Sequence, residues 1–304
     1  NRIDELGAAG GGVVIALKTL LEIMPRLRVL PQFSNLEIPS QENLDIILQG
    51  FGAVGAHATR IMKERIPKEK VIRISDIEVY LYNKDRLPVE ELYDKKKKKT
   101  LVTTEYFKTH LIDKGYKFPT KFSTNPDNLL REDAFCMVPA APVFNYLGVR
   151  ESENCSMTVE NMGKWQLIVE GANTYSPDPN KKAGRTRMEQ IVYRENGVMI
   201  ANDYLVNSGG VIFAAQEHII KTPDELKIPE EMLGNEEAVN DWLKEHTEEF
   251  KHLSKKRLEA GRDAREEVIR HNMIELVDML TANQELLPTP AAERISLKRL
   301  AKSE

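Results

Sequence analysis

The residues best suited to do chemistry are three glycines and one acid in the first quarter of the chain. Gly50, Gly52 and Gly55 follow the pattern G-x-G-x-x-G, and Asp76 lies twenty-one residues after the last of them. The first glycine permits a tight turn, the second lets the backbone approach a pyrophosphate, and the third lets a helix pack against a strand. An acid at this distance accepts hydrogen bonds from ribose hydroxyls. The pattern predicts a dinucleotide site, and a carboxylate there favours NAD because it repels the 2′-phosphate of NADP.

The elements that must position these residues flank them directly. Residues 44–49 form a short apolar run typical of a strand, 54–65 suit a helix, and 70–75 suit a second strand. The beginning of such a helix offers unpaired N–H groups and a positive dipole end to phosphates. The alternative is a plain strand–helix–strand unit that binds no ligand. The predicted cofactor residues on this side are Gly50, Phe51, Gly52, Ala53, Val54, Gly55, Asp76 and Ile77.

Three later apolar runs, 134–138, 166–169 and 199–201, also predict strands, and small or amide residues follow them. Ligands of an open parallel sheet lie beyond the carboxyl ends of its strands. Small residues there let a cofactor lie against the backbone, and asparagine amides can hold a carboxamide or a hydroxyl. Alternatively, these are ordinary turn and capping residues. The predicted cofactor residues on this side are Ala140, Ala141, Asn173 and Asn207.

Strands that alternate with helices predict an α/β fold, a Rossmann-type doubly wound and mostly parallel sheet with a C-terminal helical extension. Residues 1–220 are expected to form the dinucleotide-binding domain and 221–304 a helical segment that packs on it. Gly10, Gly11 and Gly12 are expected to precede a helix, residues 77–83 to extend the sheet, and residues 89–94 to form a short helix. Another helix is expected to begin near Val211.

The C-terminal segment is expected to hold two helices and a terminal extension, the latter over 286–304. Residues 268–280 have apolar side chains at helical spacing and predict the second helix. The face of the first is formed by Val239, Trp242, Leu243, Phe250 and Leu253.

Composition limits the remaining possibilities. The chain has 304 residues, 41% hydrophobic and 30% charged, and a formal net charge of -4, which suits a globular protein without a polyanionic partner. We find no apolar run near the roughly 20 residues that span a bilayer, so no membrane partner is expected. Cys136 and Cys155 are expected to be reduced, buried thiols of a cytoplasmic protein. The six histidines lack metal-binding spacing, so no metal is expected.

A run of five lysines, Lys95–Lys99, stands apart from this acidic balance. Basic runs occur in proteins that bind nucleic acid. This run is short and has no interleaved aromatic residues, so a solvated loop and no nucleic acid partner are expected instead.

Six pieces of the sequence occur in the order found in the cofactor-binding domain of glutamate, leucine, phenylalanine and valine dehydrogenases. They are AAGGGVVIALK, GFGAVG, VIRISD, MVPAA, VEGANTYSPDP and NDYLVNSGGV. The chain resembles this family, and most closely its NAD-specific glutamate dehydrogenases. The resemblance implies NAD as cofactor and oxidative deamination of L-glutamate to 2-oxoglutarate and ammonia. It also implies that Ala140, Asn173 and Asn207 line the nicotinamide side.

The sequence departs from the family pattern at several points. Ala9 replaces a threonine near the carboxamide, and a long segment surrounds the lysine run. Ala214 replaces the serine that receives the side-chain carboxylate of glutamate, so Ala214 as substrate residue keeps leucine, valine or phenylalanine open as the substrate.

The family's catalytic lysine and aspartate belong to an amino-terminal substrate domain with a glycine-rich lysine motif, which we do not find here. The chain is therefore expected to be a fragment that binds NAD without turnover and joins a homo-oligomer when full length. The alternative is a non-catalytic, regulatory NAD-binding module.

Overall fold

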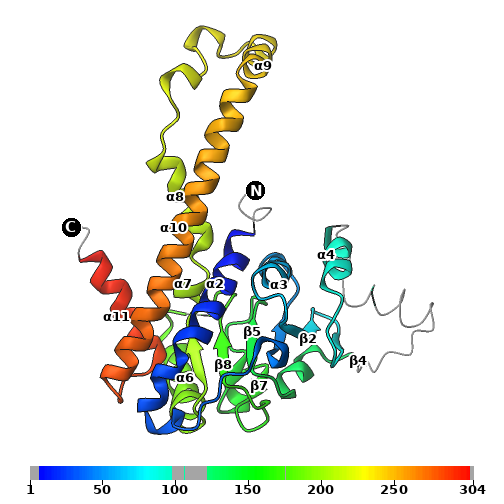
Figure 1. Ribbon diagram of the computed structural model, residues 1–304, viewed down its shortest axis with the longest axis vertical. Coiled ribbons are helices and arrows are strands. Elements are labelled where there is room, and N and C mark those ends of the chain that lie inside the picture. Colours follow the sequence, from blue (N-terminus) through cyan, green and yellow to red (C-terminus); the bar gives the residue numbers. More distant parts are fainter. Residues whose placement is uncertain (1–6, 98–105, 107–121, 175, 302–304) are drawn as a thin grey trace.

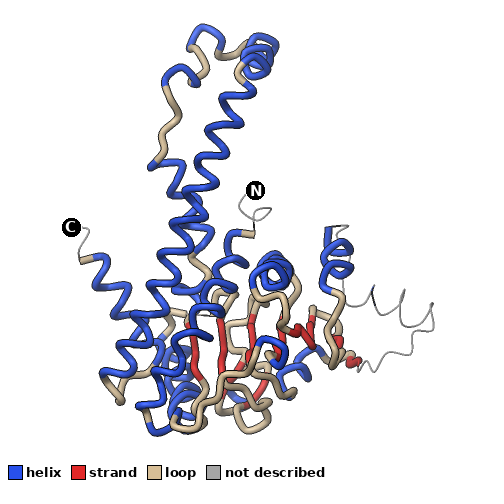
Figure 2. The backbone as a smooth tube through the Cα atoms, viewed as in Figure 1, coloured by secondary structure: helices blue, strands red, loops and turns tan. Residues whose placement is uncertain are grey.

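The centre of the computed structural model is a seven-stranded, mostly parallel sheet (Figures 1 and 2). The structure describes residues 7–97, 106, 122–174 and 176–301. The strand order is β4-β3-β2-β1-β5-β8-β9; β3 pairs with β2 and β4 in the antiparallel direction, and the other pairs are parallel. The strands are β1 (Asp45–Gln49), β2 (Lys70–Ser75), β3 (Tyr80–Tyr82), β4 (Phe122–Ser123), β5 (Cys136–Pro139), β8 (Leu167–Val169) and β9 (Met199–Ala201).

The direction of winding reverses between β1 and β5. From β1 the chain passes through α3 (Ala53–Arg65) to β2 on one side, and from β8 through α6 (Pro179–Glu189) to β9 on the other. Crossovers between parallel strands are right-handed, so opposite directions place α3 and α6 on opposite faces of the sheet. The doubly wound fold expected from the sequence is therefore confirmed. Its topological switch point lies between the carboxyl ends of β1 and β5.

The helix α2 (Ala8–Ile23) begins earlier than expected, and Gly10, Gly11 and Gly12 lie inside it. The prediction that these glycines precede the helix was wrong. A Cβ atom on Gly10 would lie 2.7 Å from the backbone nitrogen of Ala58 in α3, and one on Gly12 would overlap the carbonyl oxygen of Val206. Glycines are present here because α2 packs very close to its neighbours.

By length and composition, the segment Ala8–Val29 could cross a membrane, which the search for an unbroken apolar run missed. It comprises α2 and the 3-10 helix η1 (Met24–Val29). The protein itself buries 72% of the apolar window, and α2 packs against α3 and α10 (Thr247–Ala282). A core helix accounts for the same apolar composition.

The segment after β2 partly follows expectation. Residues 77–83 extend the sheet through β3, but in the antiparallel direction. The predicted short helix is α4 (Val89–Lys97), which includes the first three lysines of the basic run, so the loop predicted there was wrong for them. Lys98, Lys99 and residues 107–121 lie outside the described residues.

The C-terminal segment departs most from expectation. α8 (Gly209–Ile219) and α10 run side by side away from the sheet, and α9 (Glu236–Glu245) lies at the tip of this projection (Figure 1). The predicted first helix is broken at His246, whose ring stacks on Trp242 with centroids 4.3 Å apart. The predicted second helix is the C-terminal half of the 36-residue α10. The terminal extension contains α11 (Pro288–Leu300), which buries Ile295 in the core.

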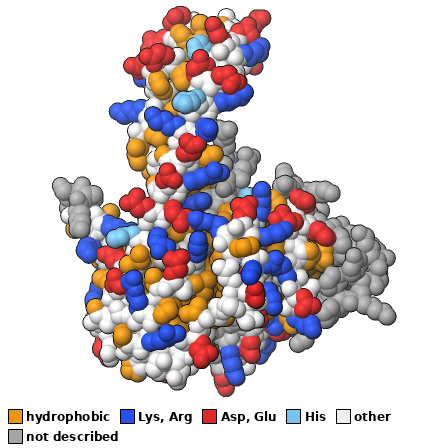
Figure 3. Space-filling model, in the orientation of Figure 1, with side chains coloured by type: hydrophobic (Ala, Val, Ile, Leu, Met, Phe, Trp, Pro, Cys, Tyr) orange, Lys and Arg blue, Asp and Glu red, His pale blue; other side chains and the backbone are white. Residues whose placement is uncertain are grey.

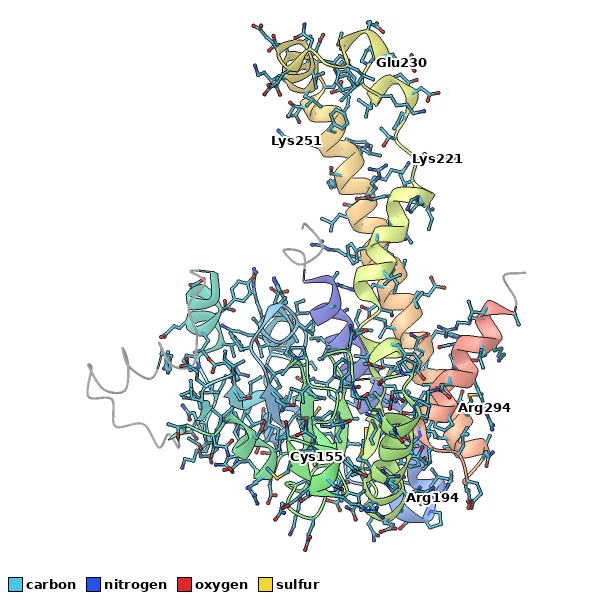
Figure 4. The ribbon with its side chains drawn as sticks, turned by 180° about the vertical axis from the view of Figure 1, so that it is seen from behind. Cys155, Arg194, Lys221, Glu230, Lys251 and Arg294 are labelled. Carbon is cyan, nitrogen blue, oxygen red and sulfur yellow. The ribbon has the colours of Figure 1, made fainter. Side chains whose placement is uncertain are left out.

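The remaining elements are short, and charges are spread over the surface. Acidic and basic side chains are intermixed on the face seen in Figure 3. From behind, Lys221, Glu230 and Lys251 lie along the projection, whereas Cys155 lies on the body and is half-buried, not buried as predicted (Figure 4). The short elements are η2 (Pro31–Phe33), η3 (Gln41–Asn43), η5 (Pro126–Arg131), β6 (Leu147–Gly148), η6 (Glu151–Glu153), β7 (Met157–Thr158), the π-helix η7 (Gln190–Glu195), α7 (Asp203–Val206), η8 (Asp224–Leu226) and η9 (Glu230–Met232).

Candidate dinucleotide site

The turn after β1 needs glycine at two positions. Gly50 has φ +94°, and a Cβ atom there would lie 2.7 Å from the backbone nitrogen of Ala141. Its N–H donates to the carbonyl of Ser75 at 3.0 Å, which ties the turn to the end of β2. A Cβ atom on Gly55 would overlap the carbonyl oxygen of Gly50, so α3 can approach β1 only with glycine there. These contacts bring the beginning of α3 to the switch point.

Gly52 is different, because among the described residues nothing beyond its own chain neighbours lies within 4 Å of a Cβ atom built on it. Gly52 and Ala53 are exposed, and the helix beginning at Ala53 has no side-chain cap. The first N–H groups of a helix have no acceptor within it, and the helix dipole adds positive charge. This open cradle fits a phosphate group. Of the other loop residues, Val54 is half-buried and Phe51 is buried, so Phe51 can offer only its backbone to a cofactor.

Asp76 lies at the end of β2, next to this cradle in the sheet. Its Oδ1 accepts N–H groups from Glu78 at 2.9 Å and Val79 at 3.2 Å, which fix the orientation of the carboxylate. The adjacent Ile77 is 80% exposed, an unusual position for a large apolar side chain. An anchored acid beside an exposed apolar surface suits a ribose and the adenine that it carries.

The two predicted asparagines meet on the other side of the switch point. Asn207 Nδ2 donates to Asn173 Oδ1 at 2.8 Å and more weakly to the carbonyl of Gly171 at 3.4 Å. Asn173 is exposed and Asn207 is half-buried, so the amide pair remains accessible. Ala140 is buried and Ala141 half-buried at the end of β5. The structure therefore brings together amide and small side chains from three neighbouring strand ends.

A buried ionic cluster behind these amides was missed by the sequence reasoning. Glu170, fully buried, accepts hydrogen bonds from Tyr146 at 2.6 Å and Arg185 at 2.5 Å. Arg185 also donates to Glu189 at 2.8 Å. Burial alone would lower the pKa of Arg185, but Glu170 and, less strongly, Glu189 hold it well above its usual range. Burial and then Glu170 raise the pKa of Tyr146. An acid at the end of an apolar strand, as Glu170 is, was the available signal.

A cavity of about 700 Å³ adjoins this cluster. Its lining includes Glu170, Thr174, Arg185 and Asp203, and none of the predicted cofactor residues. The Thr174 hydroxyl is buried without a hydrogen-bond partner among the residues that the structure describes. The lining contains both acidic and basic side chains, so its charge selects no single class of ligand.

The two alanines that depart from the family pattern lie in different helices. Ala9 is half-buried in the first turn of α2, and Ala214 is exposed in α8. Arg265 of α10 donates to the carbonyl of Ala8 at 3.1 Å, and burial lowers its pKa to about 10. A desolvated cation therefore lies beside the turn that contains Ala9.

An open α/β sheet with a glycine turn and the beginning of a helix at its switch point is characteristic of the Rossmann-type fold, in which dinucleotides bind at this position. The chain belongs to the glutamate/leucine/phenylalanine/valine dehydrogenase family, which it matches over residues 7–285. The family resemblance expected from the sequence is thus confirmed.

Several glutamate dehydrogenases are similar to this chain in sequence or in structure. Over 171 residues the chain is 30% identical to the catabolic NAD-specific glutamate dehydrogenase RocG of Bacillus subtilis. The matched region covers 56% of this chain and 32% of RocG. It is 28% identical over 167 residues to a glutamate dehydrogenase of Thermotoga maritima, covering 55% and 32%. The chain thus matches about a third of the length of these relatives. A solved glutamate dehydrogenase superposes with TM-score 0.53 at 14% identity, covering 98% of this chain and 53% of that one, which supports the fold alone.

Proposed function

We propose that this chain is the NAD-binding part of an amino acid dehydrogenase that oxidatively deaminates L-glutamate to 2-oxoglutarate and ammonia. The observation that carries the proposal is the arrangement at the switch point. An open phosphate cradle at Gly52 and an anchored acid at Asp76 lie on one side, and the Asn173–Asn207 amide pair lies on the other. A dinucleotide has phosphates between two sugars, so it matches a site with this order of groups.

Each part of the site has a separate task in this proposal. The N–H groups at the beginning of α3 bind the pyrophosphate, and the Asp76 carboxylate accepts the hydroxyls of the adenosine ribose. The exposed Ile77 covers the adenine, and the small side chains of Ala140 and Ala141 leave room for the dinucleotide across the sheet edge. The amide pair orients the nicotinamide end. NAD would supply the acceptor for a hydride from the substrate α-carbon, and the protein would hold the two carbons in near-attack geometry.

Calorimetric titration of the chain with NAD and NADP tests the proposal. We expect NAD to bind at least about tenfold more tightly, because a 2′-phosphate would be placed against the Asp76 carboxylate. Asp76→Ala should lower the affinity for NAD and reduce the difference in affinity between NAD and NADP. Absence of NAD binding, or equal affinity for NADP in the wild-type chain, would contradict the proposal.

An apolar amino acid is the second candidate substrate, favoured by Ala214. A methyl group at this position cannot donate a hydrogen bond to the side-chain carboxylate of glutamate, and an unpartnered buried carboxylate is costly. Initial rates of the full-length protein with glutamate, leucine, valine and phenylalanine separate the candidates. Because the chain matches only part of its relatives, the deamination itself belongs to that full-length protein.

A regulatory NAD-binding module remains distinguishable from the enzyme. A coding segment upstream with the glycine-rich lysine motif supports the enzyme, whereas NAD binding without such a segment supports the module.

A further inference from the structure

Asp203 connects the two loops that carry the amide pair. It is 3% exposed, and it begins α7 directly after β9. Its Oδ2 accepts the N–H of Thr174 at 2.6 Å, next to Asn173. Its backbone carbonyl accepts the N–H of Asn207 at 2.6 Å. Asp203 therefore contacts the backbone on both sides of the Asn173–Asn207 hydrogen bond.

The buried ionic cluster holds Asp203 in turn. Oε2 of Glu170 accepts the Asp203 N–H at 3.2 Å, while Oε1 accepts from Tyr146 and Arg185. Glu170 follows β8 and Asp203 follows β9, so this bond joins the ends of two neighbouring strands. The position of the amide pair is thus linked to charges on the other side of the strand ends.

We propose that Asp203 is a positioning residue for the nicotinamide end of the dinucleotide, an inference that rests on the proposed function. An ionised carboxylate only accepts hydrogen bonds, and here two N–H groups converge on it, from Thr174 at one oxygen and Tyr204 at 2.7 Å from the other. Bonds of this charge-assisted kind are about twice as strong as neutral ones. Asp203→Asn keeps the volume but turns an NH₂ donor towards one of these N–H donors. The loop carrying Asn173 would then lose its register against Asn207.

Comparison of two ligands separates positioning from a general structural role. NADH contains both ends of the dinucleotide, whereas ADP contains only the part assigned to the glycine turn and Asp76. A change in the position of the amide pair should lower the affinity for NADH and leave the affinity for ADP unchanged. Loss of the overall structure would lower both affinities.

Asp178→Asn is the matched control. Asp178 also accepts two backbone N–H groups, from Asn180 and Lys181 at 3.0 Å each, but it is exposed at the beginning of α6. With the 304-residue chain, we expect Asp203→Asn to lower NADH affinity about tenfold and ADP affinity less than about twofold. Asp178→Asn should change neither. Equal losses for both ligands, or wild-type NADH binding in Asp203→Asn, would overturn the inference.

Tyr146→Phe gives a second test that does not depend on whether Asp203→Asn folds. It removes one donor to Glu170 and only a hydroxyl from the core. We expect NADH to bind about threefold more weakly with ADP affinity unchanged, and unchanged NADH affinity would overturn the inference. A wild-type chain that binds neither ligand would instead refute the proposed function, so the two failures are distinguishable.

Discussion

Gly52 and Gly55 lie three residues apart in one motif, yet the structure predicts that alanine will affect them in opposite ways. In the part of the chain that the structure describes, an alanine methyl at Gly52 would meet nothing within 4 Å except its own chain neighbours, and the backbone there is extended, with φ −77°. The cost to the free energy of unfolding should be about 0.5–1 kcal/mol, because alanine caps helices less well than glycine. The methyl would occupy the cradle, however, and should make the binding free energy of NAD less favourable by about 2 kcal/mol, roughly a 30-fold loss of affinity.

Alanine at Gly55 should do the reverse. Its methyl would overlap the carbonyl oxygen of Gly50, so α3 or β1 must shift, at about 1–3 kcal/mol of unfolding free energy. NAD affinity should change only as far as this shift distorts the turn. Urea denaturation and calorimetric titration of both variants measure the two effects separately. A Gly52→Ala variant with wild-type NAD affinity would refute the placement of the pyrophosphate over α3.

Three further changes follow from other parts of the structure. Burial raises the pKa of Glu69 from 4.5 to about 7, so the folded state holds a proton that the unfolded state releases between these values. Stability should therefore fall by on the order of 3 kcal/mol as pH rises through this window, and urea denaturation should show no such slope in Glu69→Gln. Ile295→Ala should lower the unfolding free energy by about 2–5 kcal/mol, since this α11 side chain is fully buried; a cost below about 1 kcal/mol would mean that α11 is not part of the core. In the full-length enzyme, Ala214→Ser should raise kcat/KM for glutamate relative to leucine, and an unchanged ratio would place the carboxylate elsewhere.

The parts of the fold that were predictable are those whose cause is local. The predicted bounds of β2 agree with the structure, because the side chains of residues 70–75 alternate along the strand and the strand ends before Asp76. The turn at Gly50 follows from its own backbone conformation. In contrast, Gly10, Gly11 and Gly12 of α2 are needed only because α3, α10 and α7 approach them, which are contacts between segments far apart in sequence. No local pattern distinguishes these glycines from a flexible loop.

The buried ionic cluster was unpredictable for a related reason. Charged and polar side chains dominate residues 179–189, a composition typical of an exposed helix. Only tertiary contacts reveal the cluster: Arg185 pairs with Glu170 after β8, and Glu189 accepts a hydrogen bond from Thr289 in α11. The sequence also did not show that Thr247–Ala282 form one continuous helix, α10. The half of α10 that lies away from the sheet has mostly polar side chains, and it packs against α8.

The two ends of the proposed site therefore differ in how they are built. The phosphate end depends on backbone geometry within one short motif, and its side chains matter mainly by being absent. The nicotinamide end depends on side chains that three strand ends bring together, and Glu170 and Asp203 hold their loops in register. A change at Arg185 in α6 can therefore reach the amide pair through Glu170 and Asp203 without touching the glycine turn. It follows that substitutions at the phosphate end should lower the affinity for every adenine nucleotide alike. Substitutions in the buried ionic cluster should lower the affinity only for ligands that contain a nicotinamide.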